Sequence, residues 1–276
     1  MSGDGSVRAW PEFQQRWSEL RNVLLSSDLT RGFSYNVPPL ERIVEEVCAD
    51  ECAVMRSGIK SSSFDLTDIS GELRRRSAAE ALRTRFVLAH FDLHRSFGAP
   101  GQLFEGLEEQ WVEPWRAQLR SHGFTFDRVF SILFAAGPHS ATNYHMDFTH
   151  QLAWQQYGDK HWHALNEPDR WTTKALRYDT KSMLQLSKPA AVGARDIYTV
   201  VQRPGSALWN PQATPHWVET FSEPALTLTL VHAGLRLHGR LCPHEQERED
   251  ELLTVRVPSL AAAGLLSSRS SERARY

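Results

Sequence analysis

One short stretch of the chain, "ATNYHMDFTHQLAWQQYGDKHWHAL", brings together side chains that can bind a metal ion, among them His145, Asp147, His150, His161 and His163. His145 and Asp147 are two residues apart, and on a strand such residues point to the same face. Divalent iron is bound by two histidines and one carboxylate on one face of an octahedron, which leaves positions open for a cosubstrate and oxygen. The pair therefore predicts part of a metal centre.

The third ligand is expected to be His216, which lies in the phrase "GSALWNPQATPHWVE". This phrase predicts a strand, a proline-containing turn and a histidine that opens the next strand. Pro211 and Pro215 stiffen the turn and fix where His216 points, which matters because a metal site tolerates only small ligand displacements. His145, Asp147 and His216 are thus the predicted metal ligands and catalytic residues.

A lysine follows the first two ligands at a spacing that suits an anion site. Gly158-Asp159 is a hairpin-turn signal, so we expect the chain to turn back there and bring Lys160 into the barrel. A lysine beside a metal and a small hydroxylic residue such as Thr142 can receive a dicarboxylate. The alternative is a solvated lysine just past a turn.

The other polar candidates are expected not to bind the metal, because a fourth protein ligand would block an open position: His150, His161 and His163. Tryptophans near the motif are expected to fill the barrel rather than to contact a substrate: Trp154, Trp162 and Trp209.

The elements that position these residues change in character at Gly123. Before it, apolar side chains recur at helical spacing and predict an amphipathic helix after Pro11, with the stripe Phe13, Trp17, Leu20 and Leu24. A second helix is predicted from about Pro39. A third, "GQLFEGLEEQWVEPWRAQLRSHG", should kink or restart at Pro114. "ECAVMRSG" and "FVLAHFDL" are predicted strands.

After Gly123 the segments are short, rich in β-branched and aromatic residues, and broken by turn residues, which is typical of an all-β sandwich or barrel. "ALTLTLVH" alternates, with leucines on one face and threonines on the other. We expect one domain, residues 1–276, of helices around a β-barrel. It has an N-terminal helical region at about 9–122, a β-core at about 123–236 and a C-terminal extension at 237–276 that ends in a frayed tail.

The composition limits the partners. The formal net charge is −2, so no basic field favours nucleic acid or an anionic membrane. Three cysteines without a C-x-x-C pair argue against a disulfide framework and a structural zinc site, and predict reduced thiols in a cytoplasmic protein. We find no signal-peptide pattern and no apolar run of membrane-spanning length.

Taken together, the two phrases resemble the JmjC and cupin-like branch of the Fe(II)/2-oxoglutarate-dependent oxygenases. The resemblance covers about residues 125–235. The positions that match are Thr142, His145, Asp147, Gly158, Lys160, Gly205, Leu208, Pro211 and His216. Two positions depart from the pattern: Ser206 replaces the usual acidic residue, and Val231 stands near the place of a frequent asparagine.

The resemblance implies a double-stranded β-helix (jelly roll) with Fe(II) bound by the three ligands. It implies that 2-oxoglutarate chelates the iron through its 1-carboxylate and keto oxygen, and that its distal carboxylate meets Lys160 with help from Thr142. Oxygen would take the remaining position. Decarboxylation to succinate would then drive oxidation of an unactivated C–H bond, by hydroxylation, desaturation or cyclisation.

For the substrate, the sequence lacks a zinc finger, a chromatin-reader motif and an extensive basic tail, and its Arg and Ala usage resembles that of high-GC bacteria. We therefore expect a small amino-acid-like molecule from bacterial specialised metabolism, and natural-product biosynthesis in particular. Arg83 or Arg85 could clamp its carboxylate. The alternatives are a JmjC-type protein side-chain hydroxylase or demethylase, a non-catalytic cupin-like binding module, and a cupin that uses another metal. A homodimer is possible.

Overall fold

The computed structural model describes residues 6–58, 67–179, 183–184, 186 and 188–250. The first five residues and the predicted frayed tail lie outside the described residues. None of the helices in the described part of the chain combines the length and the apolar character needed to cross a lipid bilayer.

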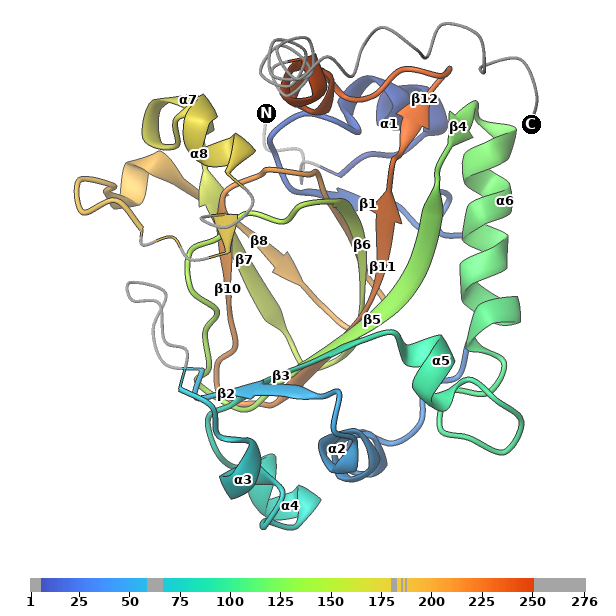
Figure 1. Cartoon of the computed structure of the whole chain (residues 1–276), viewed down its shortest axis with the longest axis vertical. Coiled ribbons are helices and arrows are strands. Elements are labelled where there is room, and N and C mark those ends of the chain that lie inside the picture. Colours follow the sequence, from blue (N-terminus) through green and yellow to red (C-terminus); the bar gives the residue numbers. More distant parts are fainter. Residues whose placement is uncertain (1–5, 59–66, 180–182, 185, 187, 251–276) are drawn as a thin grey trace, which may run out of the picture.

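The strands of the described chain form two facing antiparallel sheets and a small ribbon (Figure 1). The larger sheet has the order β1-β9-β6-β11-β5-β3-β2 and consists of β1 (Val23–Leu25), β2 (Val54–Arg56), β3 (Val87–Phe91), β5 (Arg128–Ala136), β6 (His150–Tyr157), β9 (Ala207–Asn210) and β11 (Ala225–Ala233). The smaller sheet has the order β10-β7-β8 and consists of β7 (Lys160–Leu165), β8 (Ile197–Gln202) and β10 (His216–Glu219). The ribbon pairs β4 (Phe124–Thr125) with β12 (Arg236–Leu237).

Short helices surround the sheets. They are α1 (Trp10–Arg16), α2 (Leu40–Ala49), α3 (Ser70–Leu73), α4 (Ala78–Ala81), α5 (Leu93–Phe97), the π-helix η1 (Glu108–Val112), α6 (Glu113–Ser121), α7 (Pro168–Trp171), α8 (Lys174–Tyr178) and the 3-10 helix η2 (Ala194–Asp196). In addition, residues 243–250 are helical. Figure 1 shows α6 along the outer side of the larger sheet, and α2, α3 and α4 at one end of the molecule.

The chain crosses repeatedly from one sheet to the other. It leaves β6 of the larger sheet for β7 of the smaller one, returns from β8 to β9, and returns again from β10 to β11. The expected hairpin at Gly158 is therefore wrong, because β6 pairs with β9 and β11 while β7 pairs with β8 and β10. Gly158 adopts a φ of 62°, and a Cβ there would lie 2.2 Å from the carbonyl oxygen of Pro224, so the crossing requires glycine.

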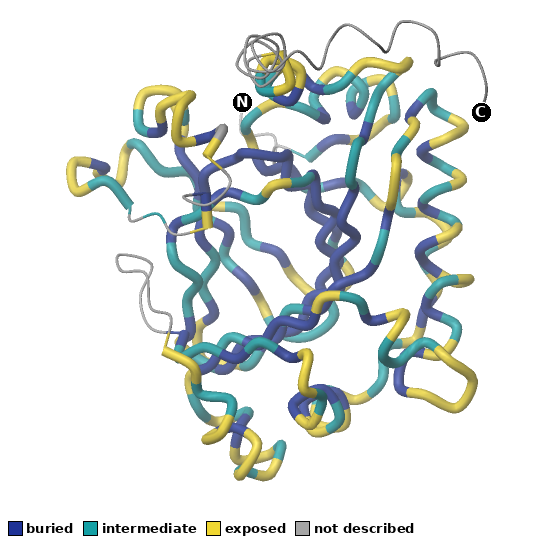
Figure 2. The backbone as a smooth tube through the Cα atoms, in the orientation of Figure 1, coloured by how far each residue is buried: buried dark blue, intermediate teal, exposed yellow. Residues whose placement is uncertain are grey.

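The main core lies between the larger sheet and the helices. Leu226, Leu228 and Leu230 of β11 are fully buried, and they share one hydrophobic cluster with Trp111 and Trp115. Figure 2 shows that β5, β6 and β11 are buried along most of their length. Burial of each such leucine contributes roughly 1.5–3 kcal/mol relative to exposure. The alternation predicted for β11 is confirmed, and its other face is thereby free to line an interior cavity.

The first predicted helix is shorter than its apolar stripe suggested. α1 ends at Arg16, and Leu24 lies on β1, which pairs with β9 in the larger sheet. Strand pairing overrides the helical spacing here, because the backbone of β1 finds its hydrogen-bond partners in the sheet. The restart at Pro114 is confirmed, since α6 carries that proline in its first turn. The N-terminal region also supplies β1, β2 and β3 to the larger sheet, and its separation from the β-core at about residue 122 stays a prediction.

Candidate metal centre

Two histidines from distant parts of the chain face each other across a single backbone bridge. His216 opens β10, as predicted, and its N–H and carbonyl exchange hydrogen bonds of 2.9 Å with those of His145. This pairing brings the two ring centroids to 4.3 Å. The sequence suggested a regular strand around His145, but the structure does not form one there. The segment is an irregular connection that runs beside β10 and touches it through isolated bridges.

Each imidazole is held in the tautomer that a metal ligand needs. His145 Nδ1 donates to the carbonyl oxygen of Asn143 at 2.8 Å, and His216 Nδ1 donates to that of Thr214 at 2.8 Å. Because a carbonyl only accepts, the proton sits on Nδ1 and the lone pair of Nε2 stays free. Burial lowers the pKa of His216 well below its ordinary value, which also keeps that ring neutral.

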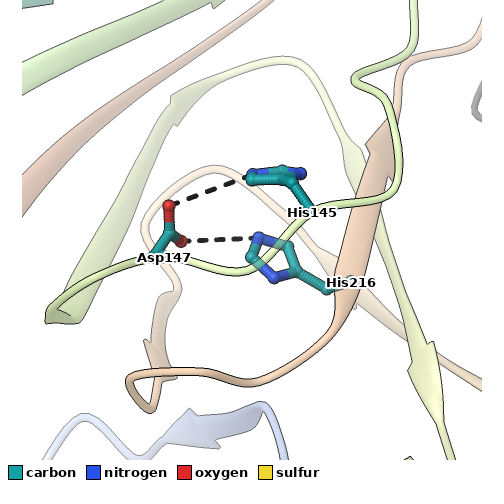
Figure 3. Close-up of side chains that lie close together, drawn as sticks. All are labelled: His145, Asp147 and His216. Atoms are coloured by element: carbon teal, nitrogen blue, oxygen red, sulfur yellow. Dashed lines mark ion pairs between the residues drawn. The ribbon is translucent and has the colours of Figure 1, made fainter. Parts of the chain in front are cut away.

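Asp147 completes the group. Its Oδ1 lies 3.9 Å from His145 Nε2, and its Oδ2 lies 3.6 Å from His216 Nε2 (Figure 3). The three ligand atoms lie within 4.8 Å of one another, and no fourth His, Cys, Asp or Glu in the described chain joins them. Two imidazoles and one carboxylate fit a divalent metal with open coordination positions.

The carboxylate is itself positioned by amides that the sequence analysis did not single out. Asn210 Nδ2 donates to Asp147 Oδ2 at 2.7 Å, and Asn22 Nδ2 donates to Asn210 Oδ1 at 2.7 Å. Burial raises the pKa of Asp147, and His145 and hydrogen bonds from Gln151 and Asn210 oppose that rise. Asn210 could have been noticed in the phrase "LWNPQATPHW", but nothing in the sequence indicates the contact with Asn22.

The three side chains open into a cavity between the two sheets, with about 560 Å³ of space that includes its mouth. It is lined by Val87, Phe134, Ala135, Ala136, Ser140, Ala141, Thr142, His145, Asp147, Gln151, Lys160, Trp162, His216, Val218, Thr220, Thr227 and Thr229. Apolar and hydroxyl side chains dominate this lining. Among the described residues that line it, Lys160 is the only ionisable side chain apart from the three candidate ligands.

Lys160 lies inside this cavity, as the sequence predicted, although a sheet crossing rather than a hairpin places it there. Only 5% of the residue is exposed, and Nζ donates to the carbonyl oxygen of Phe134 at 3.2 Å. Burial lowers its pKa to about 7. In the part of the chain that the structure describes, no carboxylate pairs with this ammonium, so its charge has no compensation at close range.

Thr142 lines the same cavity. Its Oγ1 accepts a hydrogen bond of 2.9 Å from Val218 N, which leaves the hydroxyl proton available to an anionic ligand. Trp162 also lines the cavity and stacks on His216, with centroids 5.3 Å apart and planes at 21°. Trp162 therefore fills the barrel, as expected, and also forms part of the wall beside His216.

Other sequence candidates lie away from the cavity. Arg83 and Arg85 are exposed, and neither lines it, because the short turn after α4 keeps both at the surface. His161 and His163 project from the opposite face of β7. His161 packs on Phe221, and His163 Nδ1 pairs with a hydroxyl at 2.8 Å.

The fold formed by these crossings is a double-stranded β-helix with surrounding helices, the jelly roll of JmjC and cupin proteins. No protein-family model matches this chain, and no curated protein matches it. Solved structures do match. The ribosomal oxygenase YcfD from Escherichia coli with cobalt and 2-oxoglutarate has a TM-score of 0.52 and 13% identity, over 97% of this chain and 60% of that one.

Two further YcfD structures agree. The one with succinic acid gives a TM-score of 0.53 at 12% identity, over 97% of this chain and 59% of that one. Another YcfD structure gives a TM-score of 0.54 at 14% identity, over 97% of this chain and 61% of that one. This chain thus spans about 60% of the length of those structures, and the likeness establishes the fold. The expected small amino-acid-like substrate is wrong, because these similar structures are ribosomal oxygenases.

Proposed function

We propose that this chain is an Fe(II)/2-oxoglutarate-dependent oxygenase. His145, Asp147 and His216 would hold the iron, and Lys160 and Thr142 would bind the distal carboxylate of 2-oxoglutarate. One observation carries the proposal: a single cavity contains both a two-histidine, one-carboxylate group and a buried, uncompensated lysine. A buried cation without a partner is costly, and a dicarboxylate that also binds the metal would compensate its charge.

When bound, iron, 2-oxoglutarate and oxygen would supply the oxidant for a C–H bond, with carbon dioxide and succinate as coproducts. The residues of the chain would bind the iron and 2-oxoglutarate, orient the substrate and exclude water. Asn143 and Thr214 would keep both Nε2 atoms free for the metal. The apolar and hydroxyl lining would leave the reacting C–H bond without competing charged groups.

The shared fold with ribosomal oxygenases supports ribosomal protein as the first substrate class to test. The test is succinate formation from 2-oxoglutarate with Fe(II) and ascorbate, with and without peptides from ribosomal proteins. We expect basal succinate formation that a substrate peptide accelerates, together with a mass gain of one oxygen atom on that peptide. If 2-oxoglutarate neither binds nor yields succinate above the level of metal-free protein, the proposed function is wrong.

Asn210 provides a prediction for the metal. Asn210→Ala removes the hydrogen bond to Asp147 and leaves the buried Asn22 amide without its acceptor. Substitution of a residue that orients a metal ligand typically lowers metal affinity by about 10- to 100-fold. We therefore expect Fe(II) affinity to fall by that factor while 2-oxoglutarate still binds at saturating iron.

The control for Asn210 is Asn166→Ala, which removes an exposed asparagine whose side chain donates to the backbone carbonyl oxygen of Arg195. Iron titrations in which activity is the readout should show lower Fe(II) affinity for Asn210→Ala than for Asn166→Ala. Equal iron affinity for Asn210→Ala and the unsubstituted protein would show that the hydrogen bond to Asp147 does not position the ligand.

A further inference from the structure

A second group of potential ligands lies outside the cavity. His150 opens β6, and Cys242 and Glu245 belong to the segment 241–250 near the C-terminal end of the described chain. One ring nitrogen, the Cys242 sulfur and one carboxylate oxygen lie within 4.8 Å of one another. His150 and Cys242 are 0% exposed, and Glu245 is 8% exposed. Their separation in sequence hid the group from the sequence analysis.

The polar atoms of this group are poorly satisfied by the protein. The Cys242 thiol donates to Glu245 Oε2 across 3.7 Å, a weak contact. The other oxygen, Oε1, lies 3.9 Å from Arg248 Nη2. His150 Nε2 is buried and has no hydrogen-bond partner among the residues described. A fully buried imidazole nitrogen without a partner calls for an explanation, and a bound ion is one of the few available.

The ring of His150 is held firmly. It stacks on Trp209 at 5.7 Å between centroids, and it packs against Trp17 at 4.9 Å. Its Nδ1 accepts a hydrogen bond of 3.2 Å from Gln212 N. Metal binding at either ring nitrogen would end this bond, because the neutral ring must keep one proton. The loss is one neutral hydrogen bond, which is small beside the free energy of a structural zinc site.

We propose that His150, Cys242 and Glu245 form a second metal site, of the type that binds Zn²⁺. Sulfur, nitrogen and oxygen donors are the ligands that zinc takes in proteins, and three of them leave a fourth position for water. The 3.7 Å between sulfur and Oε2 suits two donors on one tetrahedral ion. Glu245 can present Oε2 to the metal while Oε1 faces Arg248.

Metal binding would also compensate the charge of two buried acidic groups once they lose their protons. Burial raises the pKa of the Cys242 thiol to about 12, and burial likewise raises the pKa of Glu245. Without a metal the buried Cys242 thiol keeps its proton at neutral pH. Zinc would displace the thiol proton, and the carboxyl proton where present, into solvent, so binding would strengthen as the pH rises. The bound ion would join segment 241–250 to the start of β6.

The test uses the full chain and Co²⁺ as a spectroscopic probe. The first centre offers only nitrogen and oxygen donors, whereas the second offers sulfur, so a sulfur-to-cobalt charge-transfer band in the near ultraviolet distinguishes the second site from the first. We expect the unsubstituted protein to bind two equivalents of Co²⁺ and to develop this band. Asp147→Ala should bind one equivalent and keep the band. Excess Zn²⁺ should abolish the band by displacement.

Cys242→Ser should bind one equivalent and lack the band, whereas the matched control Cys48→Ser, which removes another buried thiol, should keep it. If Cys242→Ser does not fold, Glu245→Gln serves instead. It should weaken Co²⁺ binding to the second site, measured by the band, by at least tenfold. The proposal is overturned if the unsubstituted protein shows no charge-transfer band with Co²⁺, or if the band survives in folded Cys242→Ser.

Discussion

Replacing Asp147 with alanine should abolish 2-oxoglutarate turnover while the fold survives. The carboxylate supplies one of three ligand atoms within 4.8 Å of one another. Removing a residue that merely orients a ligand lowers activity or metal affinity by about 10- to 100-fold, so removing the ligand itself should exceed that range. The measurement is succinate formation at saturating iron.

The structural cost of this change should be small. Asp147→Ala removes no apolar core volume, and it also removes a carboxylate whose pKa burial raises. Near-ultraviolet circular dichroism from the buried Trp111, Trp115 and Trp209 should be unchanged. The matched control is Asp28→Ala, which removes an exposed aspartate paired with Arg31 at the surface. Retention of full iron-dependent activity by Asp147→Ala would exclude this residue from the metal centre.

Local sequence patterns were enough to predict β11 and the start of β10. "ALTLTLVH" predicted which face of β11 joins the core, because side-chain direction alternates along any strand. "NPQATPH" predicted that His216 opens a strand, because two prolines restrict the preceding turn. These inferences need only near neighbours in the chain, and the structure places the predicted residues accordingly.

The partners across sheets could not be predicted in this way. Gly158 carries a hairpin signal, yet the chain crosses to the other sheet there, since turn residues do not specify which strands pair. Leu24 continues a helical stripe but lies on β1, which pairs with β9, and its carbonyl oxygen accepts a hydrogen bond of 2.8 Å from Val7 N. The contacts of Asn22 with Asn210, and of His150 with Cys242, join distant segments. No periodicity in a single sequence encodes such pairs.

Lys160→Met should weaken 2-oxoglutarate binding by about 10- to 100-fold, because a hydrogen bond to a charged group contributes about 1.5–3 kcal/mol. Methionine keeps the length and apolar stem of the side chain but removes its ammonium. Isothermal titration with 2-oxoglutarate in the presence of Mn²⁺, without turnover, measures the change directly. The matched control is Lys174→Met, which removes an exposed lysine paired with Glu247.

The pH dependence makes this prediction more specific. In the ligand-free protein burial lowers the pKa of Lys160 from 10.5 to about 7, so the ammonium loses its proton as the pH rises above about 7. Affinity of the unsubstituted protein for 2-oxoglutarate should fall over that range, and affinity of Lys160→Met should not.

The stability of the ligand-free protein should change with pH in the opposite direction from its affinity for 2-oxoglutarate. The unfolded lysine holds its proton up to pH 10.5, so the ligand-free protein should gain stability relative to Lys160→Met between about pH 7 and 10.5. Equal 2-oxoglutarate affinity in the two proteins at pH 6.5 would place the distal carboxylate elsewhere in the cavity.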